Sequence, residues 1–292
     1  MYKIAEYMFE GMETRDGAGV KLRRIFGSQQ TVKLTDPFLL LDAFGSKNPD
    51  DYLAGFPWHP HRGIETVTYA LKGKVYHRDS EDNSGTIYPG DVQWMTAGSG
   101  IFHEEMPKYM EDNAGKILDT ELAGFQLWIN LPASQKMSTP VYRSLKSNEI
   151  PEISGDGIRV RVIAGKYMKV QGIYSGGTQD ISYFHISMDP EAQIKYISAE
   201  NYRVIIYIIS GSIKISGNTF MAGNAVSFSL SGDEIDVYAD VSSEILLMSG
   251  RPLNEPVYWY GPIVMNTREQ IEEAINDINN NKFVREKHPV ID

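Results

Sequence analysis

The chain has 292 residues, a formal net charge of −10, 42% hydrophobic residues and 23% charged residues. This balance is typical of a soluble globular protein with two domains of ordinary size. The negative charge argues against direct binding to nucleic acid or to an anionic membrane, because both require clustered positive charge. The absence of cysteine excludes disulfides, thiolate ligands and a thiol nucleophile. No apolar run has the length of a membrane span and the start lacks a signal-peptide pattern, so we expect a cytoplasmic protein.

The first half of the chain predicts a series of short strands. Residues 1–30 alternate weakly between polar and apolar and contain Gly-rich turns, and residues 34–44 form an apolar run that suits a buried strand. Further β-branched and aromatic runs follow at residues 66–70, 75–79, 86–88, 92–95, 101–106 and 121–131. Short strands with frequent turns and no long helical pattern indicate a β-sandwich or a small barrel.

A second β series repeats this pattern. Pro132, Pro140 and Pro151 punctuate a polar stretch that we interpret as an inter-domain linker. Strand-like runs resume at residues 158–164, 181–188, 204–209, 212–216 and 225–230. Similarly placed Gly turns in the two halves suggest a duplicated barrel. We therefore predict a first domain at 1–132, a linker at 133–150 and a second domain at 151–292.

One helix is predicted, close to the C-terminus. Residues 267–270, Thr-Arg-Glu-Gln, match a capping box, and three asparagines at 279–281 end the pattern. One face of this helix is apolar and is expected to cover a sheet; it carries Ile271, Ala274, Ile275 and Ile278.

The residues with chemical potential are concentrated between positions 56 and 107. His59 and His61 are separated by one residue, as are His103 and Glu105. On an extended strand, residues i and i+2 point to the same face, so each pair can face one cavity. Two such strands would assemble a metal site of three imidazoles and one carboxylate. Zinc would accept these ligands as a closed tetrahedron, whereas iron(II) or manganese(II) would keep open positions.

Glu65 competes for the role of the carboxylate ligand. It follows His61 by four residues, which places both on one face if the strand is regular. His77 lies in a His-Arg-Asp sequence, where a hydrogen-bonded strand histidine is favoured over a proton relay. The second half contains one histidine, His185, which is expected to be structural. We expect the second barrel to hold no metal.

Apolar residues near the histidines could surround an aromatic ligand. The candidates are Phe56, Trp58, Trp94, Met95 and Phe102. All five could equally be ordinary barrel core, which is the favoured interpretation for Met95 and Phe102.

Residues 59–69, His-Pro-His-Arg-Gly-Ile-Glu-Thr-Val-Thr-Tyr, resemble the first signature of the pirin family. Residues 89–98, Pro-Gly-Asp-Val-Gln-Trp-Met-Thr-Ala-Gly, continuing to His-Glu-Glu-Met-Pro at 103–107, resemble the second. Further matches lie at 36–40, Asp-Pro-Phe-Leu-Leu, and at 260–267, Tyr-Gly-Pro-Ile-Val-Met-Asn-Thr. The resemblance extends nearly end to end and weakens to a general barrel pattern between about 165 and 250.

This resemblance implies an all-β bicupin, with two β-sandwich or jelly-roll barrels face to face and a short C-terminal helix. The first barrel would carry the metal, and the second would be degenerate. The family pattern implies metal ligands at His59, His61, His103 and Glu105. Glu65 would then contact the ligands rather than the metal itself. Iron(II) is the expected metal, with manganese, cobalt, nickel, copper and zinc as alternatives.

Two activities are implied by the family. Several bacterial members are similar to quercetin 2,3-dioxygenases, which open a flavonol ring with O₂ and release carbon monoxide. In that case the partners are a small aromatic substrate and O₂, and Glu105 is the catalytic residue that takes the substrate's hydroxyl proton. Mammalian pirin instead resembles a nuclear cofactor whose iron acts as a redox switch for a transcription-regulator partner. The enzyme hypothesis is favoured.

Overall fold

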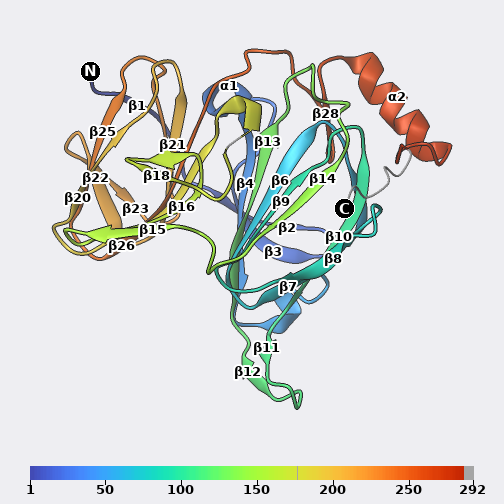
Figure 1. Ribbon diagram of the computed structural model, residues 1–292, viewed down its shortest axis with the longest axis horizontal. Coiled ribbons are helices and arrows are strands. Elements are labelled where there is room, and N and C mark those ends of the chain that lie inside the picture. Colours follow the sequence, from blue (N-terminus) through green and yellow to red (C-terminus); the bar gives the residue numbers. More distant parts are fainter. Residues whose placement is uncertain (176, 286–292) are drawn as a thin grey trace. The chain divides into compact units, whose positions relative to one another are not determined.

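The computed structural model describes residues 1–175 and 177–285, which form two compact units (Figure 1). The first barrel, as we call the unit with the histidine strands, comprises Glu13–Gln30, Phe38–Ser147 and Glu255–Asp292. The second barrel comprises Met1–Met12, Thr31–Pro37 and Asn148–Asn254.

The first barrel is built from two antiparallel sheets. The larger sheet has the order β14 (Val141–Leu145), β9 (Val92–Thr96), β6 (Ile64–Lys72), β13 (Leu122–Asn130), β4 (Phe38–Ser46), β3 (Val20–Phe26) and β2 (Met12–Asp16). The smaller sheet has the order β5 (Phe56–His61), β10 (Ile101–Lys108), β7 (Lys74–Asp79) and β8 (Ser84–Ile87). One side of each strand faces the interior, as the alternating burial along β10 illustrates.

The second barrel repeats this architecture. Its larger sheet has the order β1 (Ala5–Phe9), β24 (Ala225–Phe228), β21 (Arg203–Ser210), β26 (Ser243–Gly250), β19 (Ser182–Met188), β16 (Ile158–Ala164) and β15 (Glu152–Gly155). Its smaller sheet has the order β20 (Gln193–Ile197), β25 (Glu234–Ala239), β22 (Ser212–Ile215) and β23 (Asn218–Met221). The matching strand orders confirm the predicted all-β duplication.

The equivalent strands differ in what they place inside. β20 and β25 occupy the positions that β5 and β10 occupy in the first barrel, and neither contains a histidine. An extended cluster of buried aliphatic and aromatic side chains occupies the second barrel, contributed by β16, β19, β21, β24, β25 and β26 among others. His185 is buried on β19.

The compact units differ from the predicted domain boundaries. Residues 141–145, which we assigned to the linker, form β14 and pair with β9 in the first barrel. The N-terminal strand β1 pairs with β24 in the second barrel, although we assigned it to the first domain. The C-terminal helix belongs to the first barrel. Hydrogen bonding to a sheet edge, which sequence order does not reveal, decides these assignments. Residues 286–292 of the predicted second domain lie outside the described residues.

Smaller elements connect the sheets. They are the helices α1 (Val32–Thr35), η1 (Pro49–Asp51) and η2 (Gly177–Gln179), and the strand pairs β11 (Met110–Glu111) with β12 (Ile117–Asp119), β17 (Lys166–Tyr167) with β18 (Val170–Gln171), and β27 (Tyr258–Tyr260) with β28 (Ile263–Met265). Among the described residues, no helix is long and apolar enough to cross a lipid bilayer.

The predicted C-terminal helix is α2 (Arg268–Asn279), and it begins with the expected capping box. The Thr267 hydroxyl accepts from the backbone of Gln270, whose side chain accepts from the backbone of Thr267. The apolar face of α2 packs against β28 and Phe283 of the same unit, which confirms that it covers a sheet element.

Candidate metal centre

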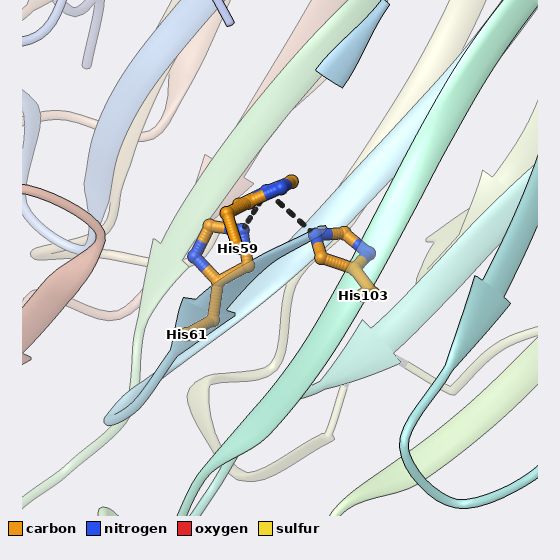
Figure 2. A group of neighbouring side chains, drawn as sticks. All are labelled: His59, His61 and His103. Carbon is orange, nitrogen blue, oxygen red and sulfur yellow. Dashed lines mark hydrogen bonds between the residues drawn. The ribbon is translucent and has the colours of Figure 1, made fainter. Parts of the chain in front are cut away.

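The histidines of the predicted metal site lie on two paired strands. β5 and β10 are antiparallel neighbours, with His59 opposite His103 and His61 opposite Ile101. The alternation along β10 buries His103 together with Glu105, as the i, i+2 spacing predicts. Figure 2 shows the three imidazole rings converging from the two strands.

The ring nitrogens of the three histidines lie close together. The Nε2 atom of His59 is 3.1 Å from Nε2 of His61 and 2.9 Å from Nε2 of His103. One nitrogen from each ring falls within a group whose members are all within 4.8 Å of one another. Burial lowers the pKa of His59, and it lowers the pKa values of His61 and His103 well below their usual 6.5. The imidazoles are therefore neutral at pH 7, the form that binds metals.

Backbone carbonyls fix the tautomers of two of these rings. The Nδ1 atom of His59 is 2.9 Å from the carbonyl oxygen of Pro57, and Nδ1 of His61 is 3.2 Å from that of Pro262. Because a carbonyl oxygen only accepts, each Nδ1 carries the proton and each Nε2 presents a bare lone pair. Two lone pairs at 3.1 Å cannot hydrogen-bond to each other, whereas a shared cation would satisfy both.

The spacing of the nitrogens also fits a metal ion. Ligand nitrogens at about 2.1 Å from a metal are ~3.0 Å apart at right angles and ~3.4 Å apart in a tetrahedron. The two measured separations from His59, 2.9 and 3.1 Å, match the right-angle value. Nδ1 of His103 is buried and has no hydrogen-bond partner among the described residues, so its tautomer is free to adapt to an ion. The three histidines fit a divalent metal.

Glu105 lies near the histidines but contacts a different group. Its Oε1 is 2.7 Å from the Thr68 hydroxyl oxygen, which in turn is 2.6 Å from Oε1 of Gln126. The carboxylate is not a member of the three-histidine group. Burial raises the pKa of Glu105 to about 7, and the hydrogen bond from Thr68 opposes this shift. Glu105 is thus a buried carboxyl group poised to exchange a proton near neutral pH.

Glu65 does not share a face with His61, although their spacing of four residues predicted that it would. The chain leaves β5 at His61 and turns at Gly63, which has a φ of 79°, before β6 begins in the other sheet. The Glu65 carboxylate accepts hydrogen bonds from Trp94 Nε1 at 3.0 Å and from the Thr96 hydroxyl at 2.7 Å. A glycine-dependent turn between two sheets breaks the strand periodicity on which the prediction rested.

A cavity of about 630 Å³ opens beside the histidines, and all the residues that line it belong to the first barrel. This volume lies in the range of sites for small organic ligands. His59, His61 and Glu105 line the cavity. The ring centroids of His61 and Trp128 are 5.1 Å apart, and those of Trp128 and Trp259 are 6.1 Å apart. A planar ligand beside the histidines would therefore meet an aromatic wall.

Only one residue of the predicted aromatic surround lines the cavity. Phe56 does so, whereas Trp94 and Met95 are buried in the sheet, and Trp58 is 46% exposed and stacks on Phe102. Trp94 and Met95 belong to the buried core, which was the alternative interpretation, whereas Trp58 belongs neither to the surround nor to the core. Phe102 is half-buried and packs on Phe283 rather than in the barrel core.

The aromatic residues that do line the cavity were missed. They are Phe44, Trp128 and Trp259, from β4, β13 and β27. Phe44 and Trp128 lie on β4 and β13, which pair across a large distance in sequence, and Trp259 reaches the cavity from a strand near the C-terminus, so local spacing carries no signal for them.

Family models match most of the chain. The model described as Pirin matches residues 19–129, and the model described as Pirin C-terminal cupin domain matches residues 183–284. The chain belongs to the pirin family. This membership confirms the resemblance inferred from the two histidine-bearing signatures, and the fold is that of a bicupin.

Relatives of this pirin are similar over nearly their whole length. A Thermoplasma acidophilum protein, provisionally named a quercetin 2,3-dioxygenase, is 48% identical over 85% of this chain and 99% of its own. Human pirin is 39% identical over 94% of this chain and 92% of its own. The crystal structure of a quercetin 2,3-dioxygenase from Acinetobacter baumannii has a TM-score of 0.89 at 32% identity, covering 97% of this chain and 99% of that one.

The turn after His61 in this pirin is held by a buried arginine. Arg62 donates to the carbonyl oxygen of Ser99 at 2.6 Å, to Asp277 on α2 at 2.8 Å and to the carbonyl oxygen of Phe283 at 3.1 Å. Its guanidinium also lies 4.2 Å from the centre of the Phe283 ring. These contacts tie the chain next to a candidate ligand to the C-terminal helix.

A buried lysine holds the other side of the same turn. Nζ of Lys136 donates to the carbonyl oxygens of Gly63 and Val264, each at 2.9 Å, and to Oδ1 of Asn130 at 2.7 Å. The predicted linker therefore includes a residue that fixes the chain close to the metal site. Burial lowers the pKa of Lys136 to about 7.

The buried lysine predicts a specific dependence of stability on pH. The pKa of Lys136 is about 7 in the folded protein and near the ordinary 10.5 in the unfolded chain. Between these two pH values the lysine is protonated in the unfolded chain and neutral in the folded protein. Stability should therefore rise with pH relative to Lys136→Met. We expect about 3.5 kcal/mol from pH 7 to pH 10, because over most of this range the unfolded chain binds nearly one more proton, at about 1.4 kcal/mol per pH unit. Urea unfolding of both proteins at several pH values measures the difference; a difference that stays flat or falls would refute it.

His77 is a buried, hydrogen-bonded strand histidine, as predicted. Its Nε2 is 2.8 Å from the Tyr142 hydroxyl oxygen, and the two rings stack at 4.9 Å. Burial lowers the pKa of His77 to about 4 and raises that of Tyr142 to about 12, so both are neutral at pH 7. Tyr142 lies on β14, so the supposed linker also supplies this contact.

Proposed function

We propose that this pirin is an iron(II)-dependent dioxygenase that opens the ring of a flavonol-like aromatic substrate with O₂. The convergence of bare Nε2 lone pairs from His59 and His61 at the edge of a cavity of about 630 Å³ carries the proposal. The quercetin dioxygenase names of two similar proteins support the same chemistry. The right-angle spacing of the nitrogens favours iron over tetrahedral zinc.

The proposal gives each residue of the site a role. His59, His61 and His103 hold the metal, and Glu105 is the proposed fourth ligand. A bound iron(II) would supply the open-shell chemistry that lets O₂ react with a closed-shell organic substrate. The Glu105 carboxylate accepts the proton of the substrate's hydroxyl, because it lines the cavity beside the histidines. The aromatic wall of Trp128 and Trp259 orients the planar substrate and excludes water.

Gas analysis with metal quantification tests the proposal. Iron(II)-loaded protein should consume O₂ and release carbon monoxide when quercetin is added, whereas zinc-loaded protein should bind quercetin without turnover. A sample that is replete in iron but releases no carbon monoxide from quercetin would overturn the dioxygenase function. If such a sample captured a transcription regulator in only one oxidation state of the iron, the family's alternative role as a redox-responsive cofactor would replace it.

A further inference from the structure

A row of polar side chains crosses the larger sheet of the first barrel. It occupies directly paired positions on five neighbouring strands: Gln93, Thr68, Gln126, Asp42 and Arg24. Residues directly opposite one another on neighbouring strands point to the same face of a sheet. Four of the five, Thr68 to Arg24, line the cavity beside the histidines. Buried polar groups on the inner face of a barrel are costly unless they are hydrogen-bonded, to one another or to a ligand.

Hydrogen bonds join the row at both ends. At the inner end, Thr68 contacts Glu105 at 2.7 Å and Gln126 at 2.6 Å. At the outer end, Arg24 donates from Nε and Nη2 to the two oxygens of Asp42, at 2.9 and 2.7 Å. No hydrogen bond joins Gln126 to Asp42 among the described residues, although the two are directly paired. A ligand group could bridge this interval.

The outer end is a preorganised charged cluster. The side chain of Asp42 is 6% exposed, and its two-point contact holds the guanidinium of Arg24 in one plane. Asp16 contacts the same guanidinium at 2.7 Å and is 52% exposed. Two carboxylates and one guanidinium carry a net charge of −1, so a carboxylate ligand would be repelled here.

Donors remain available along the row. Within residues 1–175 and 177–285, Nη1 of Arg24 makes no hydrogen bond to another residue. The single Thr68 hydrogen is donated to Glu105, so the Gln126 amide donates to the Thr68 oxygen and keeps its second amide hydrogen and its carbonyl oxygen for a ligand. The oxygens of Asp42 have further lone pairs that can accept. The amide and the guanidinium donate hydrogen bonds, and the carboxylates accept them. A ligand group that hydrogen-bonds to all of them must therefore both donate and accept, as a neutral hydroxyl does.

We propose that Gln126, Asp42 and Arg24 form a recognition strip for the hydroxyl groups of a neutral polyhydroxylated aromatic substrate, on the part of the substrate remote from the histidines. This inference rests on the proposed function and names the chemical class of its substrate. Neighbouring strands are about 4.8 Å apart, so the strip begins ~5 Å from Thr68 and ends ~14 Å from it. Apolar walls from Phe44 and Trp128 hold the rings, and the strip selects their hydroxyl pattern.

Anaerobic binding to the iron(II)-loaded and the metal-free protein tests the strip, with tryptophan fluorescence as the readout. Quercetin and 3-hydroxyflavone share the 3-hydroxyl and 4-carbonyl oxygens, but only quercetin carries hydroxyls on the other rings. A hydrogen bond to a charged group contributes roughly 1.5–3 kcal/mol, so the wild type should prefer quercetin by at least ~10-fold. A 3-hydroxyflavone with a carboxylate in place of the remote hydroxyls should bind more weakly than quercetin.

Two variants remove parts of the strip. Arg24→Met combined with Asp42→Leu removes both charges of the pair together, which avoids leaving the buried Asp42 carboxylate without its partner. Gln126→Met removes only the amide and serves if the double variant fails to fold. Each should reduce the preference for quercetin to below ~3-fold while leaving binding of 3-hydroxyflavone nearly unchanged. The matched control replaces the ion pair Lys72–Glu121, 2.8 Å long and outside the cavity, by two glutamines and should keep the full preference.

The outcomes separate this inference from the dioxygenase proposal. The strip is refuted if the wild type binds 3-hydroxyflavone as tightly as quercetin, if it prefers the carboxylate analogue, or if both variants retain the preference. A strip-dependent preference without carbon monoxide release would support the strip and overturn the dioxygenase. Carbon monoxide release with an unchanged preference for quercetin in the variants would support the dioxygenase and refute the strip.

Discussion

Replacing His61 with alanine should lower the affinity for iron(II) by more than ~100-fold and abolish O₂-dependent turnover of quercetin. Residues that merely support metal ligands typically contribute 10–100-fold in affinity, so loss of a ligand should exceed this. His61 is 1% exposed, and its Nδ1 contact with Pro262 directs its Nε2 lone pair toward that of His59. An alanine removes this donor and leaves the other two histidines as an incomplete site. Metal titration and carbon monoxide release measure the two losses.

A histidine in the second barrel supplies the matched control. His185 is also buried on a strand, and burial lowers its pKa to about 4, but it belongs to the unit without the three-histidine group. His185→Asn should retain the iron affinity and turnover of the wild type. If His61→Ala bound one iron per chain with wild-type affinity, the three-histidine centre would have to be abandoned.

The contrast between His61 and Glu65 shows which side-chain positions can be predicted from the sequence alone. The pairing of His59 with His61 depends only on strand alternation inside β5, so its convergence was predictable from spacing. The position of Glu65 depends on the turn at Gly63 and on which sheet β6 joins, which spacing does not encode. Local periodicity predicted that the histidines of each strand share one face, and it failed at the first change of sheet.

The walls of the cavity were beyond sequence reasoning for the same reason. Trp128 and Thr68 face the site because β13 and β6 are neighbours, although 58 residues separate Thr68 from its hydrogen-bond partner Gln126. The duplicated all-β fold was predictable because turns and β-branched runs recur in both halves. The assignment of β1 and α2 to their units was not, since β1 pairs with the distant strand β24 and Asp277 of α2 binds the distant Arg62. Register between distant strands therefore decides the substrate-facing part of this pirin.

Glu105→Gln should reduce turnover of quercetin by ~10²–10⁴-fold, the range for loss of a general base. An amide cannot take the substrate's proton, whereas the buried carboxyl group has a pKa of about 7. Because Glu105 is also the proposed fourth ligand, the variant should bind iron(II) more weakly than the wild type, but the loss should be smaller than that of His61→Ala, since all three histidines remain. Turnover under saturating iron, together with a metal titration, separates the base role from the ligand role. A loss of iron affinity as large as that of His61→Ala would show that Glu105 acts mainly as a ligand.

The adjacent residue provides a control for this substitution. Glu104 lies on the same strand with its side chain on the opposite face, where it accepts a hydrogen bond from Arg78 at 2.6 Å. Glu104→Gln removes the same charge from β10 without altering the cavity, so turnover should stay within ~2-fold of the wild type, because exposed ion pairs contribute little. Equal losses in Glu104→Gln and Glu105→Gln would mean that the charge of the strand, rather than a carboxyl group inside the cavity, sets the rate. The proton-acceptor role of Glu105 would then be wrong.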